Sequence, residues 1–294
     1  MLRLLALLLL VPLAASCATV PPAPAFTSDR IGVTVTGSGP DVVLIPGLSS
    51  EPQVWQSTIA AVPGYRYHLI HVSGFAGRPA GANASGPVLA PVAEEIARYI
   101  REARLSRPAI VGHSMGGSWA MMVAGRHPGL VSRVMVVDMM PFLGAMFGGP
   151  AATPESLRPV AEQMRSGMSA GTGEARRQRI EGMIATMVKT ESLRAGVVAQ
   201  SLASDPAASA QGFYDLIVTD LRPDLARIDV PLTVLWVYPP GAPISEAQMA
   251  AYYQASYAGA PQAVLRRIPD SYHFIMFDQA ELFQRELRAF LRGS

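Results

Sequence analysis

The chain has 294 residues, of which 50% are hydrophobic, and a formal net charge of +2. This length is sufficient for one sizeable domain with room for an inserted subdomain. The small net charge gives no sign of a surface for nucleic acid, so we expect no nucleic-acid partner.

The first 17 residues have the pattern of an export signal. Arg3 supplies a positive start, residues 4–13 form a short apolar run, and small residues precede Cys17. The run is too short to span a bilayer comfortably and is typical of a signal peptide. The small residues before Cys17 resemble a bacterial lipobox, which implies that Cys17 carries a lipid anchor. The pattern departs at Ala14, where a lipobox prefers a larger aliphatic residue, and ordinary cleavage after Ala18 is the alternative.

Cys17 is the only cysteine, so the chain forms no internal disulfide. The residue directly after Cys17 is not aspartate. In this the segment resembles lipoproteins that go to the outer membrane and face the periplasm or the cell surface. A soluble periplasmic or secreted protein is the alternative. Residues 18–29 are rich in proline and small residues, and we interpret them as a flexible tether.

Buried strands alternate with helices from residue 30 onward, which predicts an α/β domain with a mostly parallel sheet. Residues 139–226 differ, because they contain helical stretches and no convincing strand. We therefore expect a helical cap at 139–226, inserted into a core made of residues 30–138 and 227–294. Half of the methionines lie between Met139 and Met187, and methionine adapts to apolar ligands, so a hydrophobic pocket under the cap is a hypothesis.

A short apolar run meets Gly112-His113-Ser114-Met115-Gly116 and then turns into a helical pattern. This is Gly-x-Ser-x-Gly between a strand and a helix. A serine on such a sharp turn needs residues without a side chain two places before and after it, where a Cβ would collide with neighbouring backbone. The sequence therefore predicts Ser114 as a nucleophile at the carboxyl edge of the sheet.

A second turn is expected to supply hydrogen-bond donors to the same site. The strand at residues 42–45 ends in Pro46-Gly47-Leu48, ahead of a helix. Such a turn leaves a backbone N–H free at the sheet edge, which we assign to Leu48. Together with the N–H of Met115 it forms the two-donor oxyanion hole that acyl transfer requires.

Two further residues follow strands at the same edge. Asp138 ends the strand after the serine's helix, and His273 follows the last strand. Ligand sites of parallel sheets lie beyond the carboxyl ends of the strands, and neighbouring strands are about 5 Å apart. Asp138 is therefore within reach of a histidine that also serves Ser114, and we predict Ser114, Asp138 and His273 as a catalytic triad.

The chain resembles the α/β-hydrolase superfamily over nearly its whole mature length. The resemblance rests on three segments in this order: the turn at Leu48, the pentapeptide around Ser114 and Ser-Tyr-His273-Phe. The resemblance implies an α/β-hydrolase fold with a helical cap and a triad that needs no cofactor or metal. Most of the superfamily has the acid in the loop after the penultimate strand, but here that loop, residues 238–243, has no carboxylate. A minority has it where Asp138 stands, and we favour Asp138 over Glu246.

These residues predict a serine hydrolase that cleaves carboxylic esters of small or moderately hydrophobic molecules through an acyl-enzyme. Lactonase, thioesterase and amidase chemistry uses the same triad and stays open. The alternative of a different class is a membrane-tethered binding protein that kept the fold without the activity.

Overall fold

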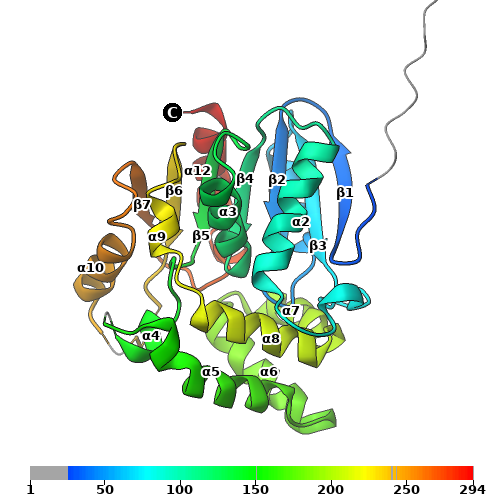
Figure 1. Ribbon diagram of the computed structural model, residues 1–294, viewed down its shortest axis with the longest axis vertical. Coiled ribbons are helices and arrows are strands. Elements are labelled where there is room, and N and C mark those ends of the chain that lie inside the picture. Colours follow the sequence, from blue (N-terminus) through cyan, green and yellow to red (C-terminus); the bar gives the residue numbers. More distant parts are fainter. Residues whose placement is uncertain (1–25, 150, 240, 243, 294) are drawn as a thin grey trace, which may run out of the picture.

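A seven-stranded sheet forms the centre of the molecule, with the strand order β1-β3-β2-β4-β5-β6-β7 (Figure 1). β1 is antiparallel to β3 and all other neighbours are parallel. The computed structural model describes residues 26–149, 151–239, 241–242 and 244–293. The predicted α/β fold with a mostly parallel sheet is confirmed. The predicted signal segment with Cys17, and residues 18–25 of the predicted tether, lie outside the described residues.

Strands and helices alternate through most of the chain. The strands are β1 (Ile31–Gly37), β2 (Asp41–Ile45), β3 (Arg66–Val72), β4 (Ala109–His113), β5 (Arg133–Val137), β6 (Leu232–Trp236) and β7 (Ala263–Arg267). The α-helices are α1 (Gln56–Ala61), α2 (Leu89–Glu102), α3 (Met115–Arg126), α4 (Ala145–Gly148), α5 (Pro154–Ser169), α6 (Gly173–Met187), α7 (Glu191–Ala203), α8 (Pro206–Val218), α9 (Arg222–Leu225), α10 (Glu246–Ser256), α11 (Ile275–Asp278) and α12 (Ala280–Arg292). Short 3-10 helices cover Pro52–Trp55 and Gly81–Asn83.

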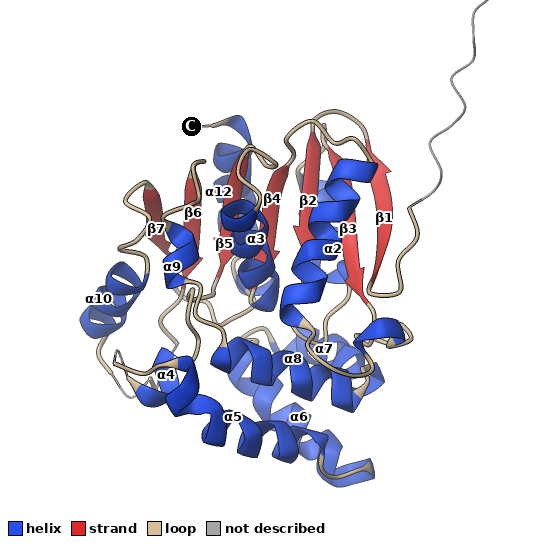
Figure 2. Ribbon diagram, viewed as in Figure 1, coloured by secondary structure: helices blue, strands red, loops and turns tan. Residues whose placement is uncertain are grey.

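The central strands are mostly apolar because both faces of the sheet are covered. Along β2, Val43 and Ile45 belong to one hydrophobic cluster, whereas Val42 and Leu44 belong to another. Helices α2 and α3 cover the first face, and α12 covers the opposite face (Figure 2). This arrangement buries the strands and leaves their carboxyl ends as the edge where a site can form.

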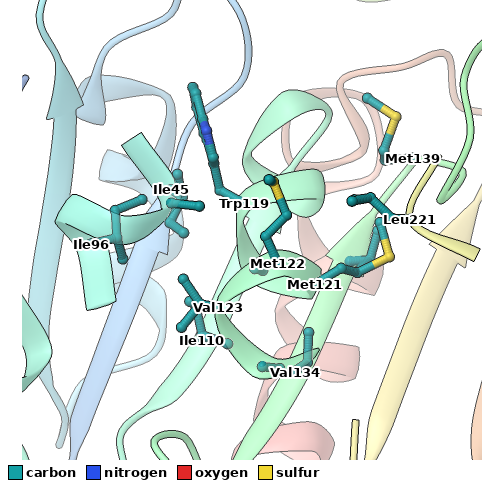
Figure 3. Packing of buried hydrophobic residues seen from close by; sticks show 14 of the residues in the cluster. Ile45, Ile96, Ile110, Trp119, Met121, Met122, Val123, Val134, Met139 and Leu221 are labelled. Carbon is teal, nitrogen blue, oxygen red and sulfur yellow. The ribbon is translucent and has the colours of Figure 1, made fainter. Parts of the chain in front are cut away.

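Helix α3, which begins directly after Ser114, is buried along nearly its full length. Trp119, Met121 and Val123 are fully buried and belong to one cluster with side chains of the sheet and of α2 (Figure 3). The indole N–H of Trp119 donates to the carbonyl of Leu89 at the start of α2. A helix that is apolar on all sides is stable only when it is surrounded by protein, so α3 is fixed against the sheet.

Helices α4 to α8 lie across the edge of the sheet where the parallel strands end (Figure 1). They occupy the stretch for which the sequence predicts a cap. Buried Asp215 of α8 connects them to the core, because its Oδ2 accepts hydrogen bonds from the N–H groups of Val88 (2.7 Å) and Leu89 (3.0 Å). These N–H groups begin α2, where a carboxylate is favourable to the helix dipole. Helix α8 is thereby held on α2.

The sequence did not predict α4, α9 and α11. Each has four residues, which is too short for a helical period of apolar residues to appear. Within the described residues, no helix combines the length and apolar character needed to cross a membrane.

We predict that Trp119→Ala lowers the free energy of unfolding by about 3–5 kcal/mol, because it opens a cavity between α3 and the sheet. Urea or thermal unfolding measures the change. Leu193→Ala is the control, since the Leu193 side chain is 39% exposed on α7 and its loss costs less than about 1 kcal/mol. Equal effects of the two substitutions would contradict the packing described here.

Candidate active site

Ser114 is in a strained backbone conformation between β4 and α3. Its φ of 54° and ψ of −126° lie in a region that residues with a Cβ rarely adopt. A Cβ at Gly112 would lie 2.0 Å from the carbonyl oxygen of Gly116, and one at Gly116 would lie 2.3 Å from that of Ile45. Both glycines are therefore required for the turn, as the motif predicts. The strained turn places the serine at the carboxyl edge, where its residue is partly accessible.

Asp138 occupies the corresponding position on the neighbouring strand. His113 of β4 pairs with Val137 of β5, and the N–H of Ser114 donates to the carbonyl of Val137 at 2.9 Å. The N–H of Asp138 in turn donates to the carbonyl of Leu235 on β6 at 2.8 Å. Like Ser114, Asp138 has a positive φ of 54°. The register of the parallel strands therefore places both residues at one edge of the sheet.

The carboxylate of Asp138 is buried and makes three hydrogen bonds. Its Oδ2 bonds to Nδ1 of His273 at 2.6 Å. Its Oδ1 accepts from the N–H of Val237 at 3.2 Å and from the hydroxyl of Tyr253 at 3.0 Å. A buried carboxylate is stable only with such partners. The bond at Nδ1 leaves Nε2 of His273 available to accept and donate a proton.

Glu246, the alternative acid from the sequence, and Asp270, an acid close to His273 in the chain, have different partners. Glu246 begins α10 and pairs with Arg267 at 2.9 Å. Asp270, three residues before His273, pairs with Lys189. Among the described residues, Asp138 is the one carboxylate that bonds to the imidazole of His273. This geometry supports the preference for Asp138 over Glu246.

His113, the residue before the serine, contacts the segment that contains His273. Its Nε2–H donates to the carbonyl oxygen of His273 at 3.1 Å, and its ring lies 4.7 Å from the ring of His273. Burial, together with the nearby His273, lowers the pKa of His113 well below its ordinary value, so this ring is neutral. His113 therefore holds the histidine loop as an uncharged donor.

The turn that contains Leu48 lies directly against the serine. A Cβ at Gly47 would be 3.0 Å from the Cβ of Ser114. A Cβ at Gly212 of α8 would meet both Met115 (Cε, 3.1 Å) and Leu48 (Cδ1, 3.2 Å), so these two side chains are neighbours. No backbone acceptor within the described residues binds the N–H of Leu48, and the first N–H groups of a helix such as α3 have no acceptor within it. Two donors are thus available near Ser114.

No hydrogen bond joins the Ser114 hydroxyl to His273 within the described part of the chain. Hydrogen bonds of this kind often tighten only when substrate is bound. The His273 side chain is 23% exposed, so its imidazole is accessible to a ligand.

The loop of His273 is also fastened to the cap. The Oδ2 of Asp278 accepts from the N–H of Tyr272 (2.9 Å), and its Oδ1 accepts from the N–H of Thr190 (2.9 Å), which lies between α6 and α7. The N–H of Phe274 donates to the carbonyl of Met187 at 3.2 Å. The cap therefore helps to fix the position of the histidine.

The methionines of the cap do not form a single apolar pocket. Met139 and Met140 are buried in the core cluster beside the sheet, whereas the Met146 and Met183 side chains are exposed. The hypothesis of a methionine-lined pocket therefore has no support from these four residues.

Sequence reasoning did not find three residues of this site: His113, Tyr253 and Asp278. His113 was visible inside the pentapeptide, but nothing in the sequence indicated that its ring contacts the histidine loop. Tyr253 reaches Asp138 from α10, which is distant in the chain, and Asp278 of α11 follows His273 closely but also bonds to Thr190 in the cap. The described residues contain no group of three or more His, Cys, Asp or Glu side chains arranged to hold a metal ion.

Known proteins resemble this chain in sequence and in fold. The sequence profile described as the Alpha/beta hydrolase family matches residues 42–285. A pimeloyl-[acyl-carrier protein] methyl ester esterase of Vibrio atlanticus is 28% identical over 218 residues, which are 71% of this chain and 80% of the relative.

Solved structures have the same fold at lower identity. An esterase from Exiguobacterium antarcticum has a TM-score of 0.73 at 20% identity and covers 89% of this chain and 95% of its own. The enol-lactonase of Burkholderia xenovorans has a TM-score of 0.70 at 18% identity and covers 89% and 96%. Because the family profile spans most of the chain and the strands, turns and helices agree with it, this protein belongs to the alpha/beta hydrolase family and is a hydrolase.

Proposed function

We propose that this protein is a serine esterase that hydrolyses carboxylic esters of small or moderately hydrophobic molecules through an acyl-enzyme. The observation that carries the proposal is the 2.6 Å bond between Asp138 and His273, at the sheet edge where the strained turn presents Ser114. A nucleophile, a base and an acid that orients the base are the groups that acyl transfer needs.

In the first half-reaction the Ser114 oxygen attacks the ester carbonyl carbon while its proton moves to Nε2 of His273. Asp138 holds Nδ1–H and stabilises the imidazolium that forms. The N–H groups of Leu48 and Met115 bind the negative carbonyl oxygen of the tetrahedral intermediate. His273 then donates the proton to the leaving alkoxide, and the alcohol departs from an ester of Ser114.

The second half-reaction repeats these steps with water. Nε2 of His273 takes a proton from water, and the resulting hydroxide attacks the acyl carbon of the Ser114 ester. The same two N–H groups bind the oxyanion, and the proton returns from His273 to the Ser114 oxygen as the carboxylic acid leaves. This chain's own side chains and backbone groups perform every step of this sequence.

The relatives support ester cleavage in general. Several related proteins have the name methyl ester esterase, and the structural neighbours include an esterase and an enol-lactonase. A lactone is a cyclic ester that the same triad opens, so lactonase activity is the second candidate. Gly212 of α8 packs against the side chains of Leu48 and Met115, so this part of the cap lies beside the turns that carry the two proposed donors.

We predict that the domain without its N-terminal signal hydrolyses p-nitrophenyl acetate, butyrate and hexanoate with higher kcat/KM than the palmitate. Ser114→Ala lowers kcat at least ~10⁴-fold, because the nucleophile is removed and the fold is retained. Release of p-nitrophenolate measures both values.

A fluorophosphonate probe supplies the control for this assay. It labels the wild type at Ser114 and leaves the Ser114→Ala variant unlabelled. A folded wild-type protein that neither turns over an ester nor reacts with the probe would favour the non-catalytic binding protein.

One pair of isosteric substitutions distinguishes the two candidate acids, Asp138 and Glu246. We expect Asp138→Asn to lower kcat by ~10³-fold or more, because it removes the charge that orients and stabilises the His273 imidazolium. Glu246→Gln changes kcat less than about twofold, since Glu246 pairs with Arg267 on the surface. The reverse order of the two effects would overturn the assignment of the acid.

We also propose that the protein is exported and attached to a membrane through a lipid on Cys17, on the basis of the lipobox-like residues before it. Metabolic labelling with palmitate is expected to mark the wild type and to leave Cys17→Ser unlabelled. A soluble mature protein that begins at Thr19 would contradict the lipid anchor and support ordinary signal cleavage.

A further inference from the structure

Tyr253 is a buried hydroxyl donor from α10 that reaches the acid of the site. Its hydroxyl donates to Oδ1 of Asp138 at 3.0 Å, on the side of the carboxylate opposite to His273. Its ring lies 5.1 Å from the ring of Trp236 in a stacked arrangement, and the residue is 5% exposed. A phenol fixed by stacking and enclosed by protein has little freedom to turn its hydroxyl away from the carboxylate.

Two donors from the segment after β6 hold Oδ1. Besides Tyr253, the N–H of Val237 donates to it at 3.2 Å. Oδ2 is thereby directed at Nδ1 of His273. The loop at residues 238–243 carries no carboxylate. The segments on its two sides nevertheless supply both donors, Val237 before the loop and Tyr253 of α10 after it, and these donors fix the plane of the carboxylate that follows β5. Tyr253 is the side chain among these donors and is therefore open to substitution.

We propose that Tyr253 is a positioning residue of the hydrolytic site, which orients the Asp138 carboxylate and sets the proton affinity of the Asp138–His273 pair through its hydrogen bond to Oδ1. The inference rests on the proposed function of Ser114, Asp138 and His273. Tyr253 touches neither the substrate nor the reacting atoms, so it acts through Asp138.

Removal of the Tyr253 hydroxyl is expected to raise the pH at which activity is lost in acid. A hydrogen bond to a carboxylate favours its charged form, so loss of the bond favours protonation of the coupled Asp138–His273 pair. Either microscopic outcome, a protonated Asp138 or a more basic His273, moves the loss of activity in acid to higher pH. The other titratable groups that face the pair are His113, which is neutral, and Tyr257, whose pKa is raised well above its ordinary value by burial and by the charge of Asp138.

The phenol of Tyr253 itself stays protonated over the acidic and neutral pH range of the assay. Burial first, and the charge of Asp138 second, raise the pKa of its phenol well above the ordinary value. Its own titration therefore does not account for a change in the acidic range.

The test compares Tyr253→Phe with Tyr67→Phe in the otherwise intact protein. Tyr67 is a matched control, because its buried hydroxyl also donates a hydrogen bond, to the carbonyl of Val62, and it lies on β3, which β2 and β4 separate from β5. Tyr253→Phe keeps the ring that stacks on Trp236 and removes one oxygen. The thermal unfolding midpoints of both variants establish that each is folded in the assay.

We expect Tyr253→Phe to lower kcat about tenfold with KM changed less than about twofold, and to move the acidic limb of the kcat/KM profile upward by about one pH unit. Tyr67→Phe leaves kcat and the limb at the wild-type values. The downfield proton resonance of the His273 Nδ1–H is a second readout, which shifts in Tyr253→Phe and not in Tyr67→Phe.

Two results would overturn the inference: a Tyr253→Phe profile and imidazole resonance like those of the wild type, or equal losses in the two variants. The Ser114→Ala and Asp138→Asn variants are measured on the same ester. If Ser114→Ala retains activity, the proposed function fails. If both of these variants are inactive and Tyr253→Phe equals Tyr67→Phe, the proposed function stands and only the role of Tyr253 fails.

Discussion

The site depends on the hydrogen-bond register of the parallel strands β4, β5 and β6. This register continues one residue beyond the strands, so that the N–H of Ser114 bonds to β5 and the N–H of Asp138 bonds to β6. Ser114 and Asp138 thus occupy equivalent register positions at one edge of the sheet, and each has a positive φ. The backbone strain at both residues is offset by the packing of the sheet between its two layers of helices.

The helices of the cap complete the site from the other side. Helix α8 places Gly212 over the side chains of Leu48 and Met115, and the segment between α6 and α7 bonds to the loop of His273 through Asp278. Asp215 holds α8 on the first turn of α2. The cap therefore contributes to the position of the oxyanion turn and of the histidine as well as covering the edge of the sheet.

The sequence was sufficient to predict the alternation of strands and helices and the mostly parallel sheet. It also led us to predict Ser114, Asp138 and His273 at one edge, since each follows a strand whose carboxyl end lies there, and the structure places the Asp138 carboxylate against the His273 imidazole. The preference for Asp138 over Glu246 came from the absence of a carboxylate in the loop after β6, and it stays a prediction that the paired substitutions test. The sequence did not indicate Tyr253 or His113 as partners of the acid and of the histidine loop, because those contacts depend on how α10 and the last loop pack in three dimensions. The short helices α4, α9 and α11 were missed because four residues show no period, and the clustering of methionines in the sequence did not become a cluster in space.

The central claim is that ester cleavage proceeds through an acyl group on Ser114. The most direct measurement is rapid mixing with a p-nitrophenyl ester followed by mass spectrometry of the digested protein. We predict a burst of about one equivalent of p-nitrophenolate per protein molecule and an acyl mass on the peptide that contains Ser114. Turnover without an acyl mass on that peptide, or an acyl group on a different residue, would contradict the account.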